Sequence, residues 1–130
     1  MSSTNASLVR RGYEAWNQGD IETVFEFLDP EIRWEGYTHI PESGTLAGRE
    51  EVKAWLGRFL EAWAELDIEV TDMIESGDRV IALVRFRGLG RGSGVEVDSG
   101  VDAHVWTVRD GRAVGVRLYQ GTREALEGLG

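Results

Sequence analysis

The chain has 130 residues, with 14 Lys and Arg against 23 Asp and Glu, which gives a formal net charge of −9. This length suits one domain with a single core, and 42% hydrophobic and 28% charged residues exclude a disordered or fibrous chain. Because so acidic a surface repels nucleic acid and anionic membranes, we expect neither as a partner.

Two absences narrow the class of protein further. The sequence has no cysteine, which excludes disulfides, thiolate catalysis and thiolate zinc sites and favours a reducing, cytoplasmic location. Residues 1–11 lack the apolar segment of a signal peptide, and no apolar run reaches the length of a membrane span. The 5 Trp residues predict either a heavily aromatic core or an aromatic-lined cavity.

The first half of the chain has helical periodicity. Leu8, Tyr13 and Trp16 recur near helical spacing, and the Gly19 region ends that pattern. The complete order expected for this half is a helix up to residue 17, a short helix between residues 20 and 29, a strand over 32–37, a loop over 38–47 and a long helix over 48–65.

The second half changes to a period of two, which is typical of strands. The expected strands lie around residues 66–70, 80–86, 101–108 and 114–118, and a last short helix follows Thr122. Asp110-Gly111 is the strongest hairpin signal, and Gly88–Gly94 is expected to form a long hairpin tip. Helices followed by hairpin-linked strands predict an α+β fold with an antiparallel sheet. Bending that sheet around the long helix would give a cone whose open end binds a ligand.

Three familiar kinds of site find no support in the sequence. The glycine-rich segment 88–94 continues into a strand rather than a helix, which argues against a phosphate-binding loop. His39 and His104 fit no metal-binding spacing, so we expect no metal and no cofactor. The lack of a GxSxG motif argues against a serine hydrolase.

One expected strand carries titratable groups on a single face. By period two, Asp102, His104 and Trp106 point the same way. Their polarity slightly favours a solvent-facing interpretation, whereas Trp106 favours an inward one. Trp16, Trp55, Phe59 and Trp63 are expected on helices, in the core rather than against a cofactor. Arg117 and Tyr119 are expected at the surface or at a subunit contact.

Several segments together suggest a family. They are 13–20 (YEAWNQGD), 28–35 (LDPEIRWE), 46–50 (LAGRE), 92–94 (GSG), 107–112 (TVRDGR) and 117–120 (RLYQ). In this order the chain resembles the SnoaL-like branch of the nuclear-transport-factor-2-like superfamily, which also contains the ketosteroid isomerases. The resemblance implies one domain over 1–130, in which a strongly curved antiparallel sheet wraps a long helix, with two shorter N-terminal helices. It also implies an apolar pocket and frequent homodimers.

The resemblance implies roles for particular residues. Glu35 falls where the isomerases keep their general base, and His104 falls where they keep a protonated acid of the oxyanion hole. Their oxyanion tyrosine would fall at Gly12, with Tyr13 one residue away. Leu118 stands where the family's epoxide hydrolases would have an acid, which disfavours that activity. The same alignment turns the face of Asp102 inward.

The function implied is cofactor-free acid/base chemistry on a small apolar carbonyl compound: isomerisation, polyketide cyclase-like aldol cyclisation or dehydration. Glu35 would abstract a proton next to the carbonyl, and His104 would donate a hydrogen bond to the enolate. The expected ligand contacts are Tyr13, Trp16, Trp34, Trp55, Phe59, Phe86, Asp102, Trp106 and Leu118. The alternative is a non-catalytic ligand-binding or dimeric scaffold domain, which gains if Glu35 and His104 do not converge.

Overall fold

The computed structural model describes residues 4–36 and 45–127. Its elements, in chain order, are α1 (Asn5–Asn17), α2 (Ile21–Phe27), β1 (Leu28–Glu35), β2 (Thr45–Ala47), α3 (Arg49–Glu61), β3 (Trp63–Ser76), β4 (Arg79–Gly90), β5 (Glu96–Arg109), β6 (Arg112–Tyr119) and α4 (Arg123–Glu127). His39, the end of the strand expected over 32–37 and residues 38–44 of the loop expected over 38–47 lie outside the described residues.

Local capping explains where the first helices begin. The Thr4 side chain accepts a hydrogen bond from the backbone N–H of Ser7 at the start of α1. Asp20 caps α2 in the same way through the N–H of Thr23. Helix α3 follows Gly48, whose φ of 90° suits a residue without a Cβ. A threonine, an aspartate and a glycine thus mark the starts of these three helices.

The six-stranded sheet has the order β2-β1-β6-β5-β4-β3. Every neighbouring pair is antiparallel except β1 and β6, which run parallel. The expectation of a wholly antiparallel sheet was therefore wrong at this one pair. Hairpins dictate antiparallel pairing between consecutive strands, but β1 and β6 are far apart in sequence and no turn constrains their direction.

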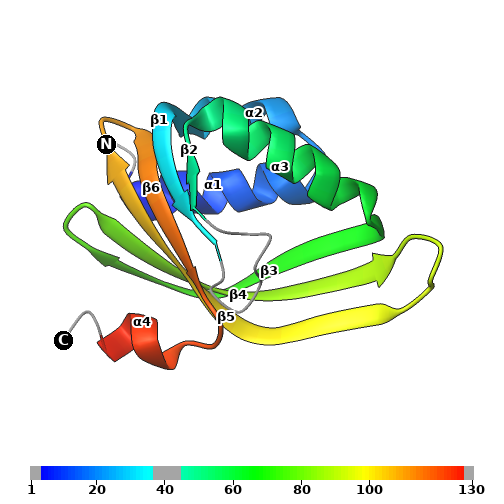
Figure 1. Ribbon diagram of the computed structural model, residues 1–130. Coiled ribbons are helices and arrows are strands. Elements are labelled where there is room, and N and C mark those ends of the chain that lie inside the picture. Colours follow the sequence, from blue (N-terminus) through cyan, green and yellow to red (C-terminus); the bar gives the residue numbers. More distant parts are fainter. Residues whose placement is uncertain (1–3, 37–44, 128–130) are drawn as a thin grey trace.

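The sheet is curved and open, with the main helices on one side. Figure 1 shows α1, α2 and α3 over the concave face, while α4 lies against the opposite face. The expected α+β cone is confirmed, although α1 and α3 both have 13 residues, so α1 is not shorter. No helix in the described parts of the chain is long and apolar enough to cross a membrane.

The largest error in the expected elements concerns the end of α3. The helix ends at Glu61, and Trp63 begins β3 instead of continuing the helical stripe to residue 65. The Trp63 ring packs edge-on against Phe86, with centroids 5.2 Å apart. It also lies over Gly88, where an added Cβ would come within 2.6 Å of the ring. Tertiary packing of Trp63 thus overrides its helical spacing.

Other boundaries move for similar reasons. Strand β1 starts at Leu28, directly after α2, rather than at residue 32. The segment Thr45–Ala47, expected as loop, forms the edge strand β2 beside β1. Strands β4 and β5 extend to Gly90 and from Glu96, so the glycine-rich hairpin tip is shorter than expected. Gly88 of β4 pairs with Leu66 of β3 on one side and with Val97 of β5 on the other, so it belongs to the sheet and not to the hairpin tip.

Candidate ligand-binding site

A cavity of about 870 Å³ lies between the helices and the concave face of the sheet. Every side chain expected to contact a ligand lines it: Tyr13, Trp16, Trp34, Trp55, Phe59, Phe86, Asp102, Trp106 and Leu118. His104 lines it as well. The size and the mainly apolar lining are typical of a site for a small organic molecule.

Aromatic rings form a continuous wall along this cavity. Trp55 and Phe59, one turn apart on α3, stack with centroids 5.2 Å apart and planes 12° from parallel. Trp34 of β1 meets Trp55 at 6.3 Å, and Phe59 meets Phe86 of β4 at 6.1 Å. Trp63 completes the wall. These rings pack against one another and also line the cavity. The two interpretations of the tryptophans, an aromatic core and an aromatic-lined cavity, are therefore both correct.

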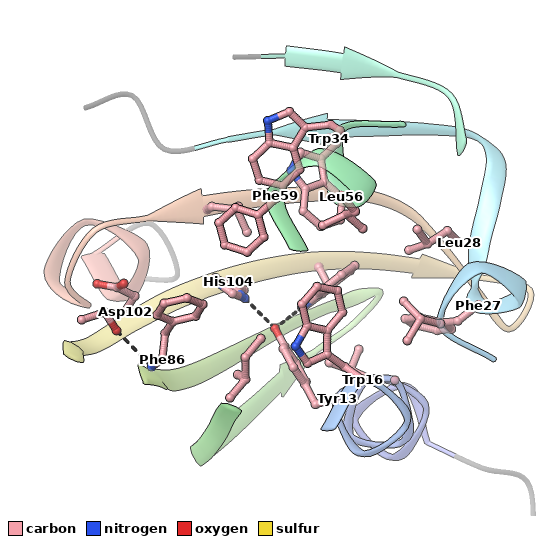
Figure 2. Close-up of a pocket in the computed structure, with 18 of the residues that line it drawn as sticks. Tyr13, Trp16, Phe27, Leu28, Trp34, Leu56, Phe59, Phe86, Asp102 and His104 are labelled. Atoms are coloured by element: carbon pink, nitrogen blue, oxygen red, sulfur yellow. Dashed lines mark hydrogen bonds between the residues drawn. The ribbon is translucent and has the colours of Figure 1, made fainter. Parts of the chain in front are cut away.

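A polar cluster interrupts the apolar lining. The hydroxyl of Tyr13 on α1 lies 2.7 Å from Nδ1 of His104 on β5. The indole N–H of Trp106 donates to the same hydroxyl at 2.9 Å. Figure 2 shows both contacts meeting at the Tyr13 oxygen inside the cavity. The resemblance put the family's tyrosine at Gly12, and the structure brings Tyr13 to the polar cluster.

The chemistry of this cluster follows from the partial burial of His104. Desolvation lowers the pKa of His104 to about 4, so its imidazole is neutral at pH 7. A neutral imidazole carries one N–H, and Tyr13 carries one O–H. One of these two protons lies in the hydrogen bond between Tyr13 and His104. The hydrogen bond between Trp106 and Tyr13 uses neither of them, because its proton comes from the indole N–H. In either tautomer the cluster thus places O–H and N–H groups in an otherwise mainly apolar lining.

Asp102 lies two residues before His104 and points to the same side of β5. Its side chain is 6% exposed, and Oδ1 accepts a hydrogen bond of 2.8 Å from the N–H of Gly121. Asp102, His104 and Trp106 all line the cavity, as their period-two spacing allows. The inward interpretation of this face is confirmed, and the solvent-facing interpretation was wrong.

Glu35 lies outside the cavity, and the placement expected for it was wrong. Successive residues of a strand point to opposite faces, so the inward Trp34 turns Glu35 outward. There the carboxylate lies 3.5 Å from Arg33 and 4.0 Å from Arg117, with its side chain 35% exposed. Glu35 and His104 therefore do not converge on one ligand.

The outer face of the sheet carries its own apolar cluster. Ile81 and Ala103 are buried there beneath Ala125 of α4. Tyr119 packs against this cluster, and the Arg117 guanidinium lies 5.0 Å from its ring centre. As expected, Arg117 and Tyr119 do not face the cavity.

Sequence reasoning missed some cavity residues. Arg58 in the last turn of α3, Ser99 on β5 and Gln120 after β6 also line it. Helical spacing gives a signal for Arg58, because it lies three residues after the cavity-lining Trp55 and so on the same side of α3. Ser99 and Gln120 gave no signal of their own, since their position depends on how the sheet curves.

This fold, with its mainly apolar cavity, is that of a small α+β domain of the nuclear-transport-factor-2-like type. A family model described as a SnoaL-like domain matches residues 9–116, and the chain belongs to that family. No curated protein gives a significant match.

Solved structures agree with this assignment. An NTF2-like protein of unknown function from Burkholderia pseudomallei is 29% identical over 97% of each chain, with a TM-score of 0.83. Bal32a, from a soil-derived mobile gene cassette, is 31% identical over 88% of this chain and 86% of its own, with a TM-score of 0.78. TerC, co-crystallized with polyporic acid, shares the fold at 23% identity, covering 96% of this chain and 97% of its own, with a TM-score of 0.81.

Proposed function

We propose that this protein binds a small, largely apolar organic molecule in its cavity and hydrogen-bonds a carbonyl or similar oxygen through Tyr13 and His104. The observation that carries this proposal is the 2.7 Å contact between these two side chains inside an aromatic-lined cavity. Burial of the ligand's rings would supply most of the affinity. Tyr13 and His104 would orient the ligand, because a ligand oxygen could hydrogen-bond to them but not to the apolar rings of the wall.

The test compares two aromatic probes of similar shape. 2-Acetonaphthone has a carbonyl, whereas 2-ethylnaphthalene does not, and either can be titrated through tryptophan fluorescence. We expect the ketone to bind about tenfold more tightly, the scale of one buried hydrogen bond. Tyr13→Phe keeps the ring but removes the hydroxyl, and it should reduce that preference. Equal binding of both probes by the unmodified protein would contradict the proposal.

A second candidate is acid/base catalysis on such a carbonyl compound. The observation in its favour is that Asp102 and His104 lie on one face of β5 and both line the cavity. His104, neutral at pH 7, would donate to the developing enolate oxygen. With Glu35 outside the cavity, Asp102 is the carboxylate among the described lining residues that could accept the proton. Isomerisation, aldol-type cyclisation and dehydration all begin with this proton transfer.

Proton exchange separates the catalyst from a binder. In D2O, a catalyst would exchange the methyl protons of 2-acetonaphthone faster than buffer does, which NMR measures directly. Loss of exchange in Asp102→Asn would support a role of Asp102 as base. Tight binding without any accelerated exchange would leave the non-catalytic ligand-binding domain as the function.

We also propose a homodimer joined through the outer face of the sheet. Support comes from Leu83, Val105 and Tyr119, which are only partly buried and pack against the apolar cluster of this face. A symmetric pair of such faces would bury this apolar surface on both copies.

A further inference from the structure

We propose that the ligand of this cavity carries a protonated amine, which Asp102 binds through its second carboxylate oxygen while the aromatic wall holds the rest. The inference rests on the binding function proposed above and names the chemical class of its ligand. It gives Asp102 a binding role rather than a role in proton abstraction.

Only one oxygen of the Asp102 carboxylate has a hydrogen-bond partner among the described residues. More than nine-tenths of this side chain is buried, since it is only 6% exposed. Oδ1 accepts from the N–H of Gly121, but Oδ2 has neither a hydrogen bond nor an ion pair to any of the described residues. Asp102 lines the cavity, and Figure 2 shows its carboxylate among the residues drawn there. The hydrogen bond from Gly121, which fixes the turn before α4, thus accounts for only one of the two carboxylate oxygens of Asp102.

The charge of the cavity lining also favours a cation. Among the described lining residues, Asp102 and Arg58 are the charged ones, because His104 is neutral at pH 7. Arg58 is exposed at the end of α3 and forms no ion pair with Asp102. The whole chain carries a net charge of −9, which favours the approach of a cation and opposes that of an anion.

An aromatic ring lies on the same face of the sheet as the Asp102 carboxylate. Asp102 pairs with Val84 across the β4–β5 ladder, and Phe86 follows Val84 on the same face. Diagonal neighbours of this kind lie within reach of an aromatic side chain. Figure 2 shows Phe86 next to Asp102, and both line the cavity. An ammonium group at Oδ2 would therefore also meet an aromatic ring, which attracts cations.

Desolvation makes this arrangement selective. A neutral hydrocarbon that filled the cavity would displace water from the Asp102 carboxylate and give it nothing in return. An ammonium group replaces that water with a charge-assisted hydrogen bond and is itself stabilised by the carboxylate. The cavity should thus discriminate between ligands of equal shape by the charge near Asp102.

The experiment uses a pair of probes that differ in that group alone. Naphthalene-1-methanamine is protonated at pH 7, and naphthalene-1-methanol is its neutral counterpart. We expect the unmodified protein to bind the amine at least about tenfold more tightly, the scale of a hydrogen bond to a charged group. Asp102→Asn retains an acceptor oxygen for Gly121 and should lose most of that preference. Melting curves would confirm that the variant is folded.

A matched control separates the local charge from the total charge. Glu96→Gln removes one negative charge from an exposed position on the same strand and should keep the amine preference. Equal binding of amine and alcohol by the unmodified protein would overturn the inference. An amine preference that survives in Asp102→Asn would overturn it too. Both results would leave the proposed binding function intact. Failure of both probes, and of 2-acetonaphthone, to bind would overturn the binding function as well.

Discussion

His104 shows how surroundings set the chemistry of a side chain. An imidazole in water is partly protonated near neutral pH, but this one lies among apolar rings and is neutral until about pH 4. Its contact with Tyr13 fixes the ring, and Trp106 in turn holds the tyrosine hydroxyl. The result is a preorganised hydrogen-bonding group, which is worth more inside an apolar cavity than in water.

The low pKa of His104 has a consequence for stability. Its pKa is 6.5 in the unfolded chain and about 4 in the fold, so between these values the unfolded state binds a proton that the native state does not. The free energy of unfolding should therefore fall as pH drops from about 6.5 to 4, by about 1–3 kcal/mol from this residue. Urea unfolding at both pH values measures it. His104→Phe should lose this part of the pH dependence, and an identical dependence in the variant would contradict the burial of the imidazole.

Glu35, in contrast to His104, is a charged group whose ion-pair partners are exposed to solvent. Exposed ion pairs such as those with Arg33 and Arg117 contribute about 0–1 kcal/mol. Glu35→Gln should therefore change the unfolding free energy by less than about 1 kcal/mol and leave the affinity for 2-acetonaphthone unchanged. A large loss of binding or of proton exchange would mean that Glu35 reaches the ligand after all.

Period two allowed part of the site to be predicted at the residue scale. It grouped Asp102, His104 and Trp106 on one face, but the direction of that face depends on the curvature of the sheet. The same rule also conflicted with the expected roles of Trp34 and Glu35, because adjacent strand residues cannot both point into one cavity. The family resemblance gave Glu35 its role, and the local geometry of β1 decides against it.

At the scale of elements, close packing between a ring and a glycine decides where α3 ends. Trp63 lies over Gly88 of β4, which has no Cβ to obstruct the ring. Helical periodicity could not reveal this contact, because it joins residues that are distant in sequence. Caps and hairpin turns are local, which explains why the order of elements was predictable while this boundary was not.

The contact at Gly88 can be tested by adding one methyl group. A Cβ there would lie 2.6 Å from the Trp63 ring, so Gly88→Ala should destabilise the fold by about 1–3 kcal/mol, as overpacking does. Gly57→Ala on α3 is the control: it has nothing within 4 Å, and it should be neutral or stabilise the helix by up to about 1 kcal/mol. Thermal melts compare the two. Equal effects would show that Trp63 does not occupy the space above Gly88.

For the whole molecule, the sheet separates two apolar regions. Its concave face, with α1, α2 and α3, encloses the cavity, while its outer face carries a second apolar cluster around Ile81 and Ala103. The general α+β cone followed from the order of elements, but the parallel pairing of β1 with β6 did not. That pairing closes the longest loop in the sheet, and no local turn encodes it.

The outer face leads to a prediction about assembly. If it joins two copies, sedimentation at micromolar concentration should give a species of twice 14.5 kDa. Tyr119→Asp would place a charge on the partly buried apolar surface and should shift the protein toward monomer. Arg112→Asp changes charge at an exposed position of the same strand and should leave the dimer intact. A single 14.5 kDa species for the unmodified protein would contradict the dimer.

The most direct test of the binding site is a crystal structure with 2-acetonaphthone. We expect the naphthalene rings against the aromatic wall of Trp55 and Phe59, with the ketone oxygen within hydrogen-bond distance of Tyr13 Oη or the His104 ring. An empty cavity at saturating ketone, or a bound ketone whose oxygen points away from both side chains, would contradict the proposed function.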